Sequence, residues 1–143
     1  MNSRTIAAAT AVFLLAASAA QADILHFDAV LKGVNETPPN AARGHGEVIA
    51  MLDTDRRTLD YTVSYSGLSG PATTASFQQH GVAATPTLAA SVLSSGPEWH
   101  GDVQLTDKQM SDLRAGHWSF NISTMEHPGG EIVGVLKRGS NVY

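Results

Sequence analysis

The 143-residue chain contains no cysteine. This absence excludes a thiol nucleophile, a zinc site with thiolate ligands and an iron–sulfur cluster, because each of them needs cysteine sulfur. It also excludes the disulfide bonds that stabilise many small exported domains. A folded domain in this chain must therefore be held together by side-chain packing and strand pairing alone.

The chain also lacks a concentration of positive charge. Its formal net charge is −4, from 9 basic and 13 acidic residues. Nucleic-acid binding needs Lys and Arg gathered on one face, because the phosphate backbone supplies most of the affinity. Here the basic residues that follow Arg4 are scattered: Lys32, Arg43, Arg56, Arg57, Lys108, Arg114, Lys137 and Arg138. We therefore expect no nucleic-acid partner.

Long apolar runs are confined to the first residues. Arg4 provides a positive start, Ile6–Ala17 is apolar, and Ala20-Gln-Ala22 fits the small-x-small pattern of a cleavage site. A transmembrane helix needs about 20 apolar residues, so this run is too short to be a membrane anchor. We expect residues 1–22 to be a cleaved secretory signal, and residues 23–143 to be a single domain of a secreted or periplasmic protein.

Alternation of apolar and polar residues dominates the expected mature chain, and this period of two is typical of strands with one buried face. The pattern is found in Leu25–Leu31, Glu47–Leu52, Leu59–Ser66, Thr74–His80 and Trp99–Leu105, and on both sides of Pro128-Gly-Gly130. Short strands that follow one another between Gly- and Pro-rich turns, without alternating helices, argue against a parallel sheet. The sequence therefore predicts an all-β fold, an antiparallel β-sandwich or small barrel.

A single segment carries a helix start signal. Thr106 can accept a hydrogen bond from the backbone of Gln109, whose side chain can return one, which is the capping-box pattern. Asp107 suits the positive end of a helix, and Gly116 is suited to end it. We expect one short helix near residues 106–115.

Four motifs occur in an order that resembles the CHRD domain family, named after chordin. They are Gly33–Pro39 (Gly-Val-Asn-Glu-Thr-Pro-Pro), Leu59–Ala72, Leu105–Gln109 and His127–Gly134, and the resemblance extends from about Phe27 to Leu136. It implies an immunoglobulin-like β-sandwich or barrel with a weak likeness to copper/zinc superoxide dismutase. The motif residues that we take as structural are Asn35, Glu36, Pro38, Pro39, Gly67, Gly70, Gly129, Gly130 and Glu131.

The two acidic motif residues could each be an acid, a ligand or a salt-bridge partner. Glu36 follows Asn35, and Glu131 follows two glycines, so both stand beside tight turns. Turns leave backbone amides that the sheet does not pair. We expect both carboxylates to accept hydrogen bonds from such amides.

Histidine is the residue that could bind copper or zinc in an exported protein without cysteine. No pair among the six histidines shows close ligand spacing, so a site would have to be assembled in space, from His80 and His127 with an acidic residue. The family's His-x-His-Gly motif aligns with Gln78-Gln79-His80-Gly81, and its later histidine aligns with Ser123. We therefore expect no cofactor, with copper or zinc as the alternative.

A catalytic set is not apparent in the sequence. The serines lack the Gly-x-Ser-x-Gly setting of a hydrolase nucleophile. We expect an exported, non-catalytic module that binds a protein or glycan partner, part of an extracellular matrix or cell envelope, through loops at one end of the sandwich. The alternative is a periplasmic copper- or zinc-binding protein with a dismutase-like sandwich.

Overall fold

The computed structural model describes residues 23–36, 39–79, 88–90 and 98–139. Residues 1–22, which the sequence predicts to be a signal, lie outside these ranges, as do Pro38 and His80. Between residues 80 and 97 only Leu88–Ala90 is described, and it forms a short strand.

The described chain forms an antiparallel sheet of nine strands with one α-helix. The elements are β1 (Ile24–Lys32), the 3₁₀-helix η1 (Gly33–Asn35), β2 (His45–Asp53), β3 (Thr58–Ser66), β4 (Ala72–Gln79), β5 (Leu88–Ala90), β6 (Glu98–Gln104), α1 (Asp107–Arg114), β7 (Trp118–Thr124), β8 (Ile132–Val135) and β9 (Lys137–Arg138). The strand order is β5-β4-β7-β8-β1-β2-β3-β6, with β9 paired to β1. The predicted all-β fold with one short helix is confirmed.

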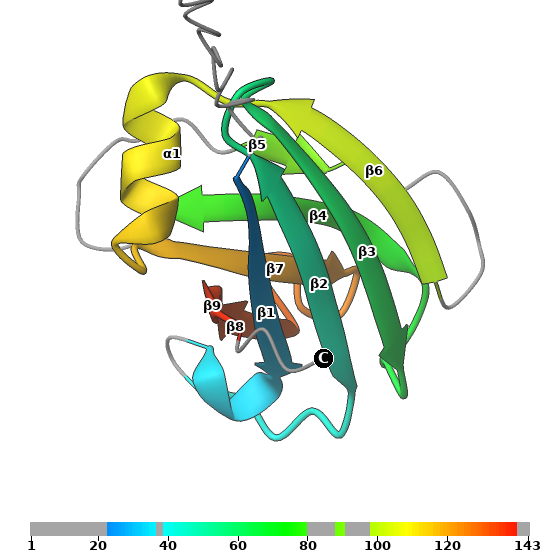
Figure 1. The fold of residues 1–143 in the computed structure, drawn as a ribbon. Helices are drawn as coiled ribbons and strands as arrows, with labels where there is room; N and C mark the ends of the chain where they lie inside the picture. Colours follow the sequence, from blue (N-terminus) through cyan, green and yellow to red (C-terminus); the bar gives the residue numbers. More distant parts are fainter. Residues whose placement is uncertain (1–22, 37–38, 80–87, 91–97, 140–143) are drawn as a thin grey trace, which may run out of the picture.

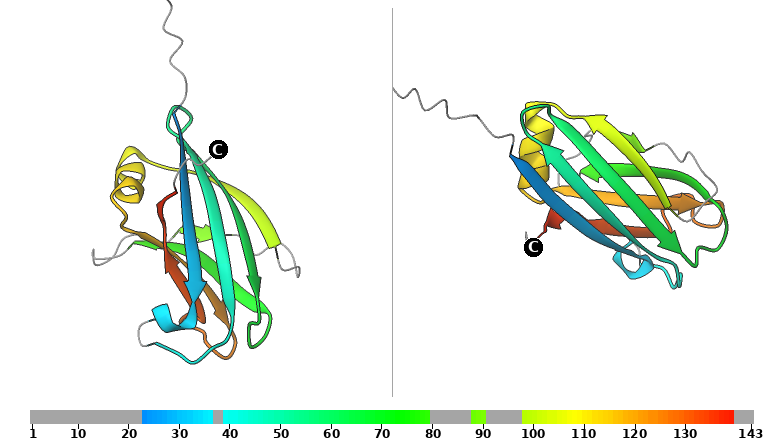
Figure 2. Two further views of the ribbon diagram at one scale, coloured as in Figure 1. Left: turned by 60° about the horizontal axis from the view of Figure 1, so that its bottom comes forward. Right: turned by 45° about the vertical axis from the view of Figure 1, so that its right-hand side comes forward.

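The sheet curls so that it encloses its own core. In Figures 1 and 2, β1, β2, β3 and β6 form one layer, and β4, β7 and β8 cross it as a second. Aromatic rings join the layers: the ring centroid of Tyr61 on β3 lies 5.0 Å from that of Phe77 on β4. Phe77 in turn lies 4.8 Å from Phe120 on β7, and both contacts are edge-to-face. Such pairs add about 0.5–1.5 kcal/mol beyond the area they bury.

The helix begins and ends at the residues that carry the local signals. Gln109 N donates to Thr106 Oγ1, and Thr106 N donates to Gln109 Oε1, which completes the capping box. At the other end Gly116 has a φ of +80°, and its backbone and that of His117 bond back to the last turn in the Schellman pattern. No helix within the described ranges is both long enough and apolar enough to span a membrane.

One narrow seam joins the two layers, where β1 meets β8 and β9. Lys32 pairs with Val133, and Asp28 pairs with Lys137. The residues between these two pairs are not paired across the seam. Gly134 lies within this open stretch, and a Cβ atom placed on it would be 2.2 Å from the backbone oxygen of Val30. The seam therefore depends on a residue without a side chain.

We predict that Gly134→Ala destabilises the fold by about 1–3 kcal/mol, because the added methyl group must push two backbones apart. The matched control is Gly129→Ala, since no atom lies within 4 Å of a Cβ placed there. Urea unfolding of both variants measures the difference. An equal effect of the two substitutions would show that the close approach at Gly134 does not matter.

Candidate functional site

Four segments from three separate stretches of the chain meet at one end of the sandwich, at the bottom of the left view of Figure 2. They are residues 35–36, 39–44, 67–71 and 125–131, which we call the loop end. Hydrogen bonds between side chains and backbone join residues of these segments. Most of the motif residues singled out in the sequence lie here, although they come from three separate stretches of the chain.

The side chain of Glu131 is the centre of the loop end. It is fully buried, with 0% relative exposure. The backbone N–H of Ser69 donates to both carboxylate oxygens, at 3.2 and 3.0 Å, and the Ser69 hydroxyl also donates to Oε1. The Thr124 hydroxyl donates to Oε1 at 3.1 Å. A buried carboxylate is stable only when its oxygens are satisfied in this way, so these donors fix the turn after β3 against β8.

Two asparagine side chains bind the backbone of β8 and of the residue before it. Asn40 Nδ2 donates to the backbone oxygen of Glu131 at 3.0 Å, and Asn35 Nδ2 donates to that of Val133 at 3.1 Å. Asn40 Oδ1 also accepts from the backbone of Ala42 at 2.9 Å, which shapes its own loop. Sequence reasoning missed Asn40, because its partner Glu131 lies 91 residues away and no local pattern marks it.

Glu36, Asn121 and Gly130 form a tight cluster beside Glu131. Gly130 has a φ of +136°, and a Cβ atom there would lie 2.5 Å from the Asn121 amide and from Glu36 Oε1. Glu36 Oε1 and Asn121 Oδ1 are buried, and neither has a hydrogen-bond partner in the described part of the chain. Burial raises the pKa of Glu36, and the nearby His127 opposes this in part. The two acidic motif residues therefore differ in their hydrogen bonding, because the Glu131 carboxylate has donors around it whereas Glu36 Oε1 has none in the described residues.

The other motif residues shape the surface of the loop end. Gly67 has a φ of +70°, a backbone conformation that favours glycine, and it packs beside Gly44. A side chain at Gly70 or Gly129 would meet open space. Pro39 is exposed, and Pro38 lies outside the described residues.

A hollow of about 320 Å³ opens beside Glu131. Exposed Arg43 and Glu126 and half-buried His127 bring charge to its lining, next to Ser69. His127 Nε2 lies 3.9 Å from Glu131 Oε1. The hollow therefore presents a small polar surface, and one of its lining residues, Ser69, is fixed by its hydrogen bond to Glu131.

Of the two histidines proposed as metal ligands, His127 lies within the described ranges and His80 does not. No group of three or more His, Asp or Glu residues in the described ranges is placed to hold a metal ion. His127 lies near Glu131, whose carboxylate already accepts hydrogen bonds from Ser69 and Thr124. His80 lies outside the described residues, so the structure does not place it.

Two positions at which the resemblance implies a histidine that this chain lacks, Gln78 and Ser123, are separated along the sheet. Gln78 on β4 pairs with Ser119, whereas Ser123 on β7 pairs with Thr74. The two positions are therefore four residues apart along the ladder, roughly 13 Å at the usual rise of a strand. Even histidines at both positions would not be direct cross-strand neighbours.

We predict that Glu131→Ala destabilises the fold by about 3 kcal/mol or more, because it leaves the donors of Ser69 and of buried Thr124 without their acceptor. Glu131→Gln should cost less, since it keeps one acceptor oxygen. Glu126→Ala is the control, an exposed neighbour expected to change stability by less than about 0.5 kcal/mol. Chemical denaturation of the three variants tests this order, and equal losses at both glutamates would refute it.

We predict that Glu36→Gln stabilises the protein at neutral pH. The folded state holds the Glu36 proton above the ordinary pKa of 4.5, so wild-type stability falls as the pH rises through the raised pKa. Gln has no charge to bury, and its amide can donate to Asn121. Thermal melts from pH 4 to pH 8 should therefore show a gain in Tm that shrinks toward low pH. A gain that is independent of pH would contradict a buried, titrating Glu36.

Comparison with known proteins identifies the fold family. A family model described as the CHRD domain matches residues 27–136. This range begins in β1 and ends just before β9, so it includes both layers and all four segments of the loop end. A search of curated proteins and a search of solved structures each returned no match. The match to most of the chain shows that this protein, a small β-rich module, belongs to the CHRD domain family.

Proposed function

We propose that this protein is an exported, non-catalytic binding module that attaches to a protein or glycan component of an extracellular matrix or cell envelope. The loop end is its binding surface. The observation that carries the proposal is the buried Glu131, whose hydrogen bonds with Ser69 and Thr124 hold the turn after β3 against the end of β7.

Ordered loops favour binding because less conformational entropy is lost when a partner is engaged. At the loop end, Glu131 anchors the turn at Ser69, and Asn40 anchors the loop before β2. Loops on a rigid sandwich commonly carry recognition. The buried network thus supports a surface whose shape is set before a partner arrives.

The loop end exposes both charged side chains and an apolar side chain, which a partner could contact together. Arg43 and Glu126 offer both signs of charge at the hollow. Met125, with 87% of its surface exposed, stands beside Glu126. Charged and apolar groups side by side are typical of surfaces that contact proteins, and ionic and hydrogen-bonding groups also suit glycans.

A non-catalytic role agrees with the chemistry around Ser69 and with the family, which consists of non-catalytic modules. The Ser69 hydroxyl donates to Glu131, and no histidine in the described ranges bonds to it. Nucleophilic serine needs a base that is free to take its proton. Here the carboxylate serves instead as a shared acceptor for Ser69 and Thr124. Export is supported by the signal-like residues 1–22.

Binding should depend on the charges at the hollow. We expect Arg43→Glu/Glu126→Lys, which keeps the net charge, to weaken binding at least ten-fold. The readout is binding of immobilised residues 23–143 to purified envelope glycans and to secreted proteins. The matched control is Lys108→Glu/Asp112→Lys, which reverses the ion pair between exposed Lys108 and half-buried Asp112 on α1. An equal loss of binding in both variants, or no loss in either, would show that the loop end is not the binding surface.

The alternative function is copper or zinc binding through His127 and His80, favoured by the position of His127 beside Glu131. A metal at 100 times its dissociation constant adds roughly 2.7 kcal/mol to the stability of the native state. For a domain of this size the Tm should rise by several degrees. A rise with copper(II) or zinc that is lost in both His80→Ala and His127→Ala would replace the binding-module proposal, and no rise would exclude the alternative.

A further inference from the structure

One long edge of the described sheet ends without a partner strand. β6 is the last strand of the order on its side, and Figure 1 shows it at the border of its layer. It pairs with β3 over its whole length of seven residues, and within the described ranges no strand pairs with its other side. β5, at the opposite end of the order, is described over only three residues. A regular edge strand is a template on which another strand can pair.

The sequence of β6 lacks the features that protect an edge strand from pairing. Natural edge strands commonly carry Lys, Pro or a β-bulge for this purpose. Glu98–Gln104 (Glu-Trp-His-Gly-Asp-Val-Gln) contains neither Lys nor Pro, and its pairing with β3 has no shift of register. The strand therefore keeps the regular backbone that a second ladder needs.

The hydrogen-bond pattern shows which residues of β6 direct their backbone groups toward the edge. Leu105 N donates to the backbone oxygen of Arg57 at 2.7 Å, and the direction of these groups alternates along an antiparallel strand. Counted back from Leu105, the odd-numbered residues of β6 bond to β3, so the even-numbered residues direct N–H and C=O away from it. These even-numbered residues, all exposed, are the β6 edge: Glu98, His100, Asp102 and Gln104.

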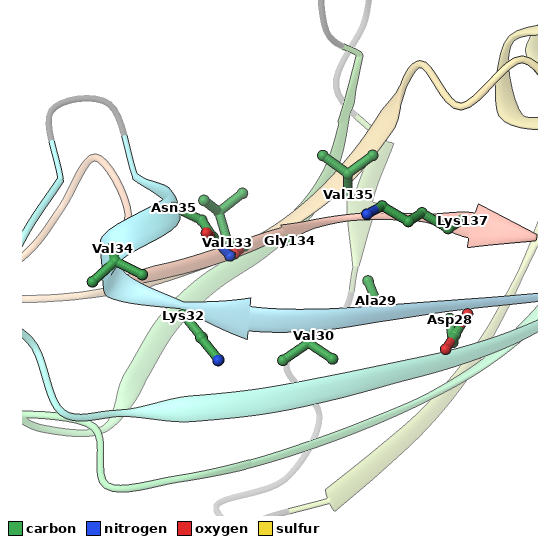
Figure 3. Close-up of a pocket in the computed structure, with 10 residues that line it drawn as sticks. All are labelled: Asp28, Ala29, Val30, Lys32, Val34, Asn35, Val133, Gly134, Val135 and Lys137. Atoms are coloured by element: carbon green, nitrogen blue, oxygen red, sulfur yellow. The ribbon is translucent and has the colours of Figure 1, made fainter. Parts of the chain in front are cut away.

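The seam between β1 and β8 is the other place where pairing is interrupted, and it cannot admit a strand. Figure 3 shows Val30 and Val135 along a groove of about 640 Å³ that follows the seam. The backbones beneath it are too close, because a Cβ atom on Gly134 would be 2.2 Å from the backbone oxygen of Val30. An added strand needs about 4.8 Å on each side. The β6 edge is therefore the better place for strand addition.

We propose that the β6 edge is the contact between two copies of this chain, whose β6 strands pair antiparallel about a two-fold axis through Gly101. In this register His100 lies opposite Asp102 of the other copy, and Glu98 lies opposite Gln104 of the other copy. The axis repeats both pairs. Each pair exchanges two backbone hydrogen bonds, and the imidazole and the amide are groups that can donate to the carboxylates opposite them.

The charges of the β6 edge select this register. A shift by two residues in one direction places Glu98 opposite Asp102 of the other copy. A shift in the other direction places the two Asp102 side chains opposite each other. Like charges in such positions are destabilising, and the register about Gly101 is free of them. The edge is thus complementary to itself, which favours a second copy as its occupant.

Asp102 also has a reason within its own chain to gain such a partner. It stands directly opposite Asp60 on β3, in a pair whose backbone groups point away from each other. Side chains lie closest in pairs of this kind, so the two carboxylates repel each other. A donor from His100 of the other copy would offset this repulsion.

The oligomeric state is the first test. Residues 23–143 contain every strand of the described fold and are the form to measure. The proposal does not rest on the loop end, because no residue of the β6 edge belongs to it. Sedimentation-velocity ultracentrifugation from 1 to 200 μM should show a monomer–dimer equilibrium. A monomer throughout this range would overturn the proposal.

An exchange of charges tests the register. His100→Asp places acid opposite acid at both symmetry-related pairs and should raise the dimer dissociation constant at least ten-fold. His100→Asp/Asp102→His restores a histidine opposite each aspartate, so it should regain near wild-type affinity. A dimer that is unchanged by the single substitution, or that is not recovered by the double one, would refute pairing about Gly101.

Two controls separate this contact from general effects of charge and folding. His45→Asp makes the same change at an exposed residue of β2, which β3 separates from the edge, and it should leave the dimer intact. Circular dichroism and thermal melts verify the fold of each variant. If His45→Asp weakens the dimer as much as His100→Asp, the effect is one of overall charge and the β6 edge is not the interface.

Discussion

The buried carboxylate of Glu131 is the interaction on which the loop end depends. A carboxylate removed from water is costly unless its oxygens accept hydrogen bonds. Here Ser69 and Thr124 supply the donors, and the backbone of Glu131 holds Asn40. Because Ser69, Asn40 and Glu131 belong to separate loops, this single residue ties together parts of the chain that the sheet alone would leave independent.

The curled sheet makes this convergence geometrically possible. β8 pairs with β7 on one side and touches β1 on the other, so the turn before β8 lies where both layers end. Gly134 allows β1 and β8 to approach closely, and the rings of Tyr61 and Phe77 hold the layers together deeper in the core. The architecture thus places Glu131 at the junction, and the hydrogen bonds then order the loops.

Glu36 and Glu131 show how environment separates two residues of the same type. Both follow turn-forming motifs, and both were expected to accept hydrogen bonds from loop amides. Glu131 accepts hydrogen bonds from Ser69 and Thr124, whereas the buried Glu36 Oε1 has no hydrogen-bond partner in the described residues. The raised pKa of Glu36 follows from this burial. A difference of this kind comes from neighbours in space, which the local sequence does not contain.

Local chemistry in the sequence determined the strands, the ends of the helix and the family. Alternation over Leu59–Ser66 predicts a strand because neighbouring side chains point to opposite faces, and Thr106 with Gln109 predicts the helix start because both lie within one turn. Tertiary structure alone decided that Asn40 and Ser69 meet Glu131, 91 and 62 residues away. The physical reason is that hydrogen-bond partners and surface neighbours depend on strand order and sheet curvature, which no single segment specifies.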